Sequence, residues 1–424
     1  MTDTFSFFVG VDLGAERHAV VVLNAAAEIL GRRYFAHNGA EVLELFSWLA
    51  KLTDQASPQQ IAIAAETPRG SILESALERG HPAFSINPKQ LDRFRDRFSM
   101  AGAKDDHRDA FVLASSLRTD QHCFRRLQLG DPRLVLLREL SRSQEQLQQN
   151  LRRACNQLWS LLQRYFPALL QLSPAADDPW LWSLLQAGPR PATAARLKLP
   201  RLEKILAQHR VRRFSASELK ALLEQPPLPM APGAAEALAE PVLLLLPHLE
   251  LLHKQLAQLS ARIDKLIDQL QQDTSFTEHR DIEILRAFPG LGRVFTATVL
   301  AEAYLPLVER DYHALRALSG VAPVTRQSGK TELVLLRRAC NHRVQHAIFH
   351  SANVFVQKDP RAKLQYRRLR AKGKTHARAL RGVADRMLNL LFALLKSQSC
   401  YDPERRTVPT EPEGTPPPKK TLDK

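Results

Sequence analysis

Four acidic residues have the types and positions needed to bind a divalent metal ion. Asp12 and Glu66 each end a short apolar run, and Asp106 and Asp109 lie three residues apart. A charge that directly follows a buried strand needs a compensating partner, and side chains three residues apart share one face of a helix. Carboxylate oxygens suit a hard cation such as Mg²⁺, and paired metal ions activate a nucleophile in phosphodiester chemistry.

The segments around these acids predict short strands and one helix. The apolar runs 7–12 and 19–23 are typical of two strands joined by a short turn, and the run 61–66 is a third strand-like segment. Residues 108–114 have the pattern of a helix. Carboxylates at strand ends and on a facing helix could converge on one or two metal ions. The alternative is that these are ordinary surface acids, because Asp is common in turns and at helix N-termini.

The composition favours an intracellular protein of two or three domains. The 424 residues are enough for several cores, no stretch approaches about 18 uncharged apolar residues, and the N-terminus lacks a signal pattern. We therefore expect a cytoplasmic protein with no membrane partner. The four cysteines are too scattered for a zinc site or a disulfide framework, so they are expected to be free thiols.

Positive charge is concentrated in the C-terminal part of the chain. The 60 basic residues exceed the 44 acidic residues, giving a net charge of +16, and residues 310–400 contain 19 basic and 4 acidic residues. A surface this basic is typical of a protein that contacts a phosphate backbone. The alternative is a solvated basic face without a partner. Membrane binding is disfavoured because the amphipathic apolar face that it needs is missing.

Two apolar registers predict long helices suited to a coiled coil. They run over residues 137–165 and 245–270, with alternating steps of three and four. The two helices could pair with each other as an antiparallel hairpin, or each could meet a copy in a second chain. We favour the second arrangement, and so a homo-oligomer. Between them lies a Pro- and Leu-rich insertion in which Ser215 and Glu218 predict a capping box.

Two motifs in the basic segment could contact or cut a phosphodiester backbone. Residues 282–297 read as two helices joined by a Gly-Leu-Gly turn, which looks like a helix-hairpin-helix element whose glycines let backbone N–H groups approach a phosphate. Ser328 lies in a Gln-Ser-Gly-Lys turn, where a serine ordinarily hydrogen-bonds its own backbone, and only a base or metal would make it a nucleophile. The candidates for phosphate contacts are Arg293, Arg326, Lys330, Arg337, Arg338 and Arg343.

In their order along the chain, these motifs resemble those of the IS110-type transposases. The segments that match the acidic, ribonuclease H-like (Holliday-resolvase-like) domain of that family are 9–14 with His18, Glu66-Thr67 with Gly70, and 104–110. Its second block is matched by Gly320-Val321-Ala322-Pro323 followed by Ser328-Gly329. The chain departs from the family pattern at Asp105, at Pro68-Arg69 and at residues 333–336.

The resemblance implies a role for each matching residue. By this resemblance, the metal ligands are Asp12, Glu66, Asp106 and Asp109, and the nucleophile that attacks DNA is Ser328. The activity implied is that of an insertion-sequence transposase, which cuts and rejoins DNA through a serine-linked intermediate. It further implies Mg²⁺ or Mn²⁺, assembly as dimers or tetramers, a structured guide RNA, and a prokaryotic, nucleoid-associated location.

The fold expected from the patterns and the resemblance is α/β plus all-α. It combines an N-terminal ribonuclease H-like (RuvC-like) mixed sheet, long coiled-coil helices, and a C-terminal helical domain with a helix-hairpin-helix element. The expected domains are an acidic catalytic domain at 1–128, a first coiled-coil helix at 129–172, a helical insertion at 173–241, a second coiled-coil helix at 242–275, a basic serine transposase domain at 276–400 and a disordered tail at 401–424.

Two other functions fit the same residues. One is a metal-dependent nuclease or Holliday-junction resolvase, in which the four acids act alone and Ser328 is structural. The other is a non-catalytic coiled-coil protein that binds DNA. Dependence of activity on Ser328 would separate the transposase from the nuclease, and dependence on Asp12 or Glu66 would separate both from the third.

Overall fold

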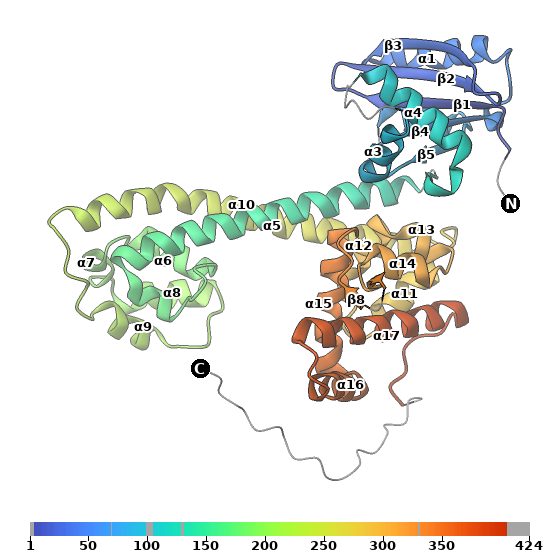
Figure 1. The fold of residues 1–424 in the computed structure, drawn as a ribbon. Coiled ribbons are helices and arrows are strands. Elements are labelled where there is room, and N and C mark those ends of the chain that lie inside the picture. The colour runs from blue at the N-terminus through green and yellow to red at the C-terminus, as the bar shows by residue number, and fades with distance from the viewer. Residues whose placement is uncertain (1–3, 69, 99–104, 129–130, 330, 405–424) are drawn as a thin grey trace. The chain divides into compact units, whose positions relative to one another are not determined.

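The chain forms two compact units, Met1–Asp131 and Pro132–Lys424 (Figure 1). This computed structural model describes residues 4–68, 70–98, 105–128, 131–329 and 331–404. Most of the tail predicted at 401–424 lies outside the described residues, as does Lys330. None of the described helices is both long and apolar enough to cross a membrane.

The first unit is built on a six-stranded mixed sheet with the strand order β3-β2-β1-β4-β5-β6. The strands are β1 (Phe7–Leu13), β2 (Arg17–Asn24), β3 (Ile29–Ala36), β4 (Ile61–Ala65), β5 (Ala83–Ser85) and β6 (Arg125–Arg126). β1 pairs antiparallel with β2 and parallel with β4. The strands predicted at 7–12, 19–23 and 61–66 are therefore confirmed.

Helices cover both faces of this sheet. The side chains of each strand alternate between the two faces, so apolar side chains on both faces are buried. The helices of this unit are α1 (Gly39–Leu52), α2 (Ser71–Glu78), α3 (Pro88–Asp96) and α4 (Asp106–Thr119), with single 3-10 turns at Pro58–Gln60 and Gln121–Cys123. Val9 and Val11 share a core with α1 and α2. Phe8 and Ala19 share the opposite core with α4. The helix predicted at 108–114 is thus the centre of α4, on one face of the sheet.

Two long helices, α5 (Pro132–Tyr165) and α10 (Ala234–Gln272), pack antiparallel in the second unit (Figure 1). Arg133 binds Asp273 near one end of the pair, and Gln144 donates a hydrogen bond of 2.8 Å to Ser260 further along. The predicted apolar seams line two cores within the same chain. Of the two arrangements that the registers left open, the structure has the pairing within one chain. The seams therefore do not support an oligomer, and the homo-oligomer stays a prediction.

Shorter helices cover the two ends of this helix pair. The insertion contributes the 3-10 turn Pro167–Gln171 and α6 (Pro179–Ala187), α7 (Pro191–Ala194), α8 (Leu199–Gln208) and α9 (Ala216–Leu223). The C-terminal part contributes α11 (His279–Ala287), α12 (Arg293–Glu302), α13 (Tyr304–Val308), α14 (Tyr312–Leu318), α15 (His342–Lys358), α16 (Pro360–Ala371) and α17 (His376–Ser397). The capping box at α9 is confirmed, because the Ser215 N–H donates to Glu218 Oε2 at 2.6 Å and the Glu218 N–H donates to Ser215 Oγ at 3.2 Å.

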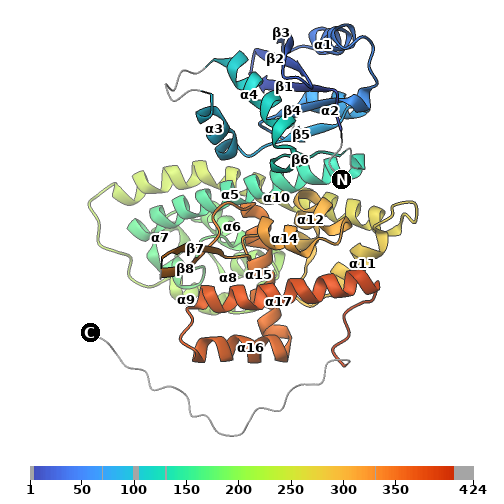
Figure 2. The same ribbon diagram turned by 45° about the vertical axis from the view of Figure 1, so that its right-hand side comes forward.

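A β-hairpin that the sequence did not predict carries Ser328 (Figure 2). Its strands are β7 (Val324–Ser328) and β8 (Thr331–Leu335), with Ser328 paired to Thr331. Gly329, directly after Ser328, has a φ of +56°, in the left-handed region that favours glycine. Residues 327–329 therefore lie at the turn end of a hairpin, and Ser328 lies at its tip.

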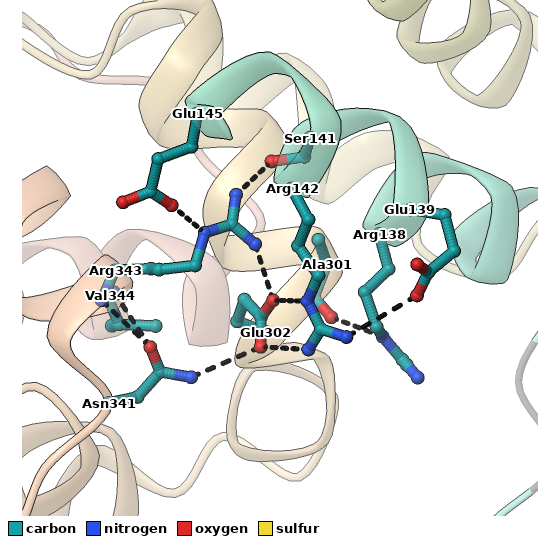
Figure 3. Close-up of polar contacts among 10 residues, drawn as sticks. All are labelled: Arg138, Glu139, Ser141, Arg142, Glu145, Ala301, Glu302, Asn341, Arg343 and Val344. Carbon is teal, nitrogen blue, oxygen red and sulfur yellow. Dashed lines mark hydrogen bonds and ion pairs between the residues drawn. The ribbon is translucent and has the colours of Figure 1, made fainter. Parts of the chain in front are cut away.

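Glu302 joins three helices that are far apart in the sequence (Figure 3). Its carboxylate accepts hydrogen bonds from Arg142 at 2.7 and 3.0 Å, from Arg343 at 2.6 Å and from Asn341 at 3.2 Å. Asn341 also caps α15 by accepting from the N–H groups of Arg343 and Val344. The network therefore fixes the start of α15, which follows the serine hairpin, against α5 and α12.

The Glu302 carboxylate is stabilised in its charged form although it is almost fully buried. Burial alone raises its pKa, but the hydrogen bond and charge of Arg142, the charge of Arg343 and the hydrogen bond of Asn341 outweigh burial, so the pKa lies below its usual value. A carboxyl whose pKa is lower in the folded chain than in the unfolded chain stabilises the fold at pH values above the unfolded pKa. This stabilisation is lost as the pH falls through the folded pKa. The ion-pair network is therefore at full strength at neutral pH.

Replacing Glu302 by Gln should destabilise the second unit by about 3–5 kcal/mol at pH 7.5, because Arg142 and Arg343 both lose the buried carboxylate that they share. Urea unfolding followed by circular dichroism measures the effect. The difference from wild type should shrink below pH ~4.3, the unfolded value for Glu.

Glu139→Gln is the matched control. Glu139 also binds Arg142, at 3.4 Å, but its side chain is 61% exposed. Its loss should change the free energy of unfolding by less than about 1 kcal/mol. Equal effects of the two substitutions would contradict a central role for Glu302.

Candidate functional site

The sheet places Asp12 and Glu66 next to each other. Val11 of β1 pairs in parallel register with Ala65 of β4, so Asp12 and Glu66 follow at the same edge of two neighbouring strands. Asp106 and Asp109 lie in the first turn of α4, which packs on β1 and β2. The Asp109 side chain is buried, whereas Asp12, Glu66 and Asp106 are partly exposed.

Gly10 brings α4 onto the sheet beside these acids. A Cβ atom at this position would lie 1.9 Å from the carbonyl oxygen of Ala110, the residue that follows Asp109. Any other residue at position 10 would therefore push the helix away from β1. The close approach of backbone to backbone sets the distance between the helix acids and the strand acids.

The three other acids act on the charge of Asp12. Burial raises the pKa of Asp12, and the charges of Asp109, Asp106 and Glu66 raise it further, in that order. The charge of Arg95 acts in the opposite direction. An ionised Asp12 thus lies in a field of three further carboxylates, an arrangement that a cation would relieve.

Arg95 of α3 is a member of this cluster that the sequence did not single out. Its Nε and Nη2 donate to the two oxygens of Asp109 at 2.7 and 2.9 Å, and its Nη2 lies 4.0 Å from Glu66 Oε2. Its Nη1 donates to Asp92 at 2.5 Å. One arginine among several in a polar helix carries no sequence signal, because its partner is 14 residues away and becomes a neighbour only in the folded chain.

The four carboxylates are suitable ligands for a hard cation, but they are not arranged as ligands here. Among the described residues, no group of three or more His, Cys, Asp or Glu side chains lies close enough to hold a metal ion. Both Asp109 oxygens are engaged by Arg95. Asp109 could coordinate a metal only after Arg95 released it, so the metal-binding roles of the four acids stay predictions.

Ser328 is exposed at the tip of its hairpin. Within the described part of the chain, its hydroxyl makes no hydrogen bond to a residue that could act as a base. A serine hydroxyl is a weak nucleophile until a base or a metal removes its proton. The hairpin therefore presents the hydroxyl to an incoming substrate without activating it.

The candidate phosphate-binding residues fall into different settings. Arg326 and Arg338 are exposed, and Arg337 donates to the Ala322 carbonyl at 3.3 Å. The Arg293 side chain is 71% exposed and binds Asp264. Arg343, by contrast, is 19% exposed and is held by Glu302 and Glu145. Arg343 therefore has a structural role, because its guanidinium is already bound by two carboxylates and not open to a phosphate.

The glycines of the predicted helix-hairpin-helix element have separate environments. Gly290 has a φ of +94°, and a Cβ atom there would lie 2.8 Å from the backbone oxygen of Ser351 in α15. Gly292 faces open space. Gly290 is thus required for helix packing, and only the Gly292 side of the turn is open to a phosphate, so DNA contact by this element stays a prediction.

Asp12→Asn should stabilise the first unit at pH 7.5 by about 0.5–2 kcal/mol, the usual gain when a strained functional position is neutralised. The pKa of Asp12 is raised in the folded chain, so the wild type is at a disadvantage above that pKa, and the gain should vanish as the pH falls towards ~3.9. Thermal unfolding in metal-free buffer across this pH range measures it. Asp96→Asn, at an exposed position of α3, is the control and should give little change; a destabilised Asp12→Asn would contradict the crowding of like charges.

Comparison with known proteins identifies the family of this chain. A family model described as Transposase matches residues 9–167, which include the four acids. A model described as Transposase IS116/IS110/IS902 family matches residues 282–367, which include Ser328.

Individual relatives agree with these models. The protein named as a transposase y4uE, from Sinorhizobium fredii, is 44% identical over 216 residues, 51% of this chain and 60% of that protein. The 43.6 kDa protein of insertion element IS110 from Streptomyces coelicolor is 27% identical over 410 residues, 95% of this chain and 96% of the relative. The protein from the same species named for transposition of the IS117 mini-circle is 32% identical over 415 residues, 96% of this chain and 98% of the relative. The chain therefore belongs to the IS110 family of insertion-element transposases.

Proposed function

We propose that this chain cuts and rejoins DNA at the ends of an insertion element, using its four acids and Ser328. The observation that carries the proposal is the placement of four carboxylates: Asp12 and Glu66 at the same edge of two paired strands, and Asp106 and Asp109 in the first turn of the helix packed on that sheet. Membership of a transposase family indicates that the substrate is DNA, because transposition requires phosphodiester bonds to be broken and made.

Ser328 is the proposed nucleophile. Its Oγ attacks a scissile phosphorus, the Oγ–P bond forms, and the P–O bond to the leaving deoxyribose breaks. The serine proton passes to a base, and the leaving oxygen takes up a proton. Because the phosphodiester is retained as a serine ester, attack by a hydroxyl of another strand reverses the reaction, so rejoining needs no external energy source. The exposed position of Ser328 at a hairpin tip suits a group that must reach a DNA backbone.

The four acids are the proposed ligands of Mg²⁺ or Mn²⁺. When bound, such ions polarise the phosphate and lower the cost of deprotonating the nucleophile. The role of this chain's own residues is to hold the ion: Asp12 and Glu66 from the strand ends, and Asp106 and Asp109 from α4. Arg95 must release Asp109 for this to occur, and until then it supplies the positive charge that allows the carboxylates to approach one another.

The proposed partners follow from the basic surface and the family. Arg293, Arg326, Lys330, Arg337 and Arg338 are the proposed contacts to the phosphate backbone of the element ends and target. Assembly as a dimer or tetramer and use of a structured guide RNA are also proposed, since a basic surface serves DNA and RNA equally. Action on the chromosome would place the protein in the cytoplasm, at the nucleoid.

Ser328→Ala should abolish a covalent protein–DNA adduct that wild type forms on a branched donor-end substrate with Mg²⁺ and co-purified RNA. Adducts are counted by denaturing gel electrophoresis of labelled DNA. Asp12→Asn should reduce the adduct by at least a hundredfold, because the metal that assists attack is lost. Ser397→Ala, at an exposed serine near the end of α17, is the control and should leave the yield unchanged.

The alternative functions give different results. Metal-dependent cleavage that survives Ser328→Ala without an adduct would assign the chain to the nuclease or resolvase class. DNA binding with no cleavage by any variant would indicate the non-catalytic class.

A further inference from the structure

A pocket lies at the base of the hairpin whose tip carries Ser328. It encloses about 420 Å³ between β8, α15 and α17. Its apolar walls include Leu335, Leu336 and Phe349, and its polar groups include Gln345, Arg378 and Arg381. Ligand sites in proteins commonly have volumes of ~300–1,000 Å³, so the pocket is large enough for a small planar group and its substituents.

The apolar strand beside this pocket is unusually exposed. Leu333, Leu335 and Leu336 are 54, 40 and 50% exposed, and Val334 between them is 40% exposed. Soluble proteins seldom leave a run of apolar side chains uncovered unless it contacts a ligand or a partner. These side chains belong to none of the buried cores in the described part of the chain, so they are available to cover something that binds.

The charge of the pocket indicates what the occupant must carry. Arg378 and Arg381 lie three residues apart on α17, and among the described residues that line the pocket there is no Asp or Glu. Arg378 donates to the Val334 carbonyl at 3.3 Å, which holds it against the hairpin. Two guanidinium groups beside an apolar wall favour a ligand that is both anionic and flat.

We propose that this pocket binds one unpaired nucleotide of the DNA strand that Ser328 cuts. The base would stack on the apolar wall at Phe349, as bases do on aromatic side chains in single-strand binding. The Gln345 amide can both donate to and accept from a base edge, and the two arginines would neutralise the adjoining phosphate. An apolar segment from a second copy would cover the leucines but would leave the arginines without an anion.

The distance to Ser328 fixes which nucleotide this would be. Leu335 lies four residues from Thr331, the partner of Ser328, so the pocket is about 13 Å along the hairpin from the serine. Stacked nucleotides advance about 3.4 Å each, so the base should lie within about four nucleotides of the scissile phosphate. This inference rests on the proposed cutting role of Ser328 and adds to it a local opening of the duplex.

The test places 2-aminopurine, whose emission rises on unstacking, at successive positions of the cut strand in the branched substrate, with full-length protein. Wild type should increase the emission at one position within about four nucleotides of the cut. Arg381→Gln and Leu336→Ser should remove this increase and weaken binding by about tenfold, and Arg381→Gln should also lower the salt dependence of binding by about one phosphate contact. Arg386→Gln, at an exposed position of the same helix, is the control. It should leave the emission increase in place and should weaken binding by no more than the loss of one positive charge predicts.

Three results would overturn the inference. They are no emission change at any position, a change that persists in Arg381→Gln and Leu336→Ser, or a change only on an RNA strand of the same sequence. Loss of self-association in Leu336→Ser with unchanged emission would assign the surface to a second copy instead. Adduct formation by wild type is measured on the same substrate, so failure of the pocket is distinguished from failure of the serine chemistry.

Discussion

Repulsion between carboxylates is the constraint on which the proposed catalytic unit depends. The parallel pairing of β1 and β4 puts Asp12 and Glu66 side by side, and the close approach at Gly10 adds the acids of α4. Such a cluster opposes folding unless a positive charge offsets it. In this chain Arg95 does so from α3, by binding both oxygens of Asp109. The fold thus gathers carboxylates at one edge of the sheet and offsets their charge with an arginine of its own.

In the second unit, by contrast, positive charges are gathered around one negative charge. The chain is rich in arginine, yet Arg142 and Arg343 are drawn inward to one buried glutamate, Glu302. This network anchors the helix that follows the serine hairpin, while the hairpin itself extends Ser328 into solvent. A rigid base with an exposed tip is the arrangement expected of a nucleophile that must meet a large substrate.

The sequence revealed those features that depend on local pattern. Alternation and run length located the three central strands, and the spacing of Asp106 and Asp109 put them on one helix. It could not reveal Arg95, because a guanidinium partner is selected by tertiary contact. The sequence predicted Arg343 to be a phosphate ligand, because counting basic residues does not distinguish a buried arginine from an exposed one. It missed the hairpin at 324–335, whose apolar strand lacks the alternation of a half-buried strand, and it could not decide whether the long apolar seams met within the chain.

Metal binding by the four carboxylates is the central claim, and isothermal titration with Mn²⁺ tests it most directly. Wild type should bind one or two ions per chain, Asp12→Asn should weaken binding by at least tenfold, and Arg95→Gln should strengthen it because a competing cation is removed. Asp96→Asn should bind as wild type does. If Asp12→Asn bound Mn²⁺ as tightly as wild type, the acids would be partners of Arg95 alone, and the proposed metal-assisted chemistry would be wrong.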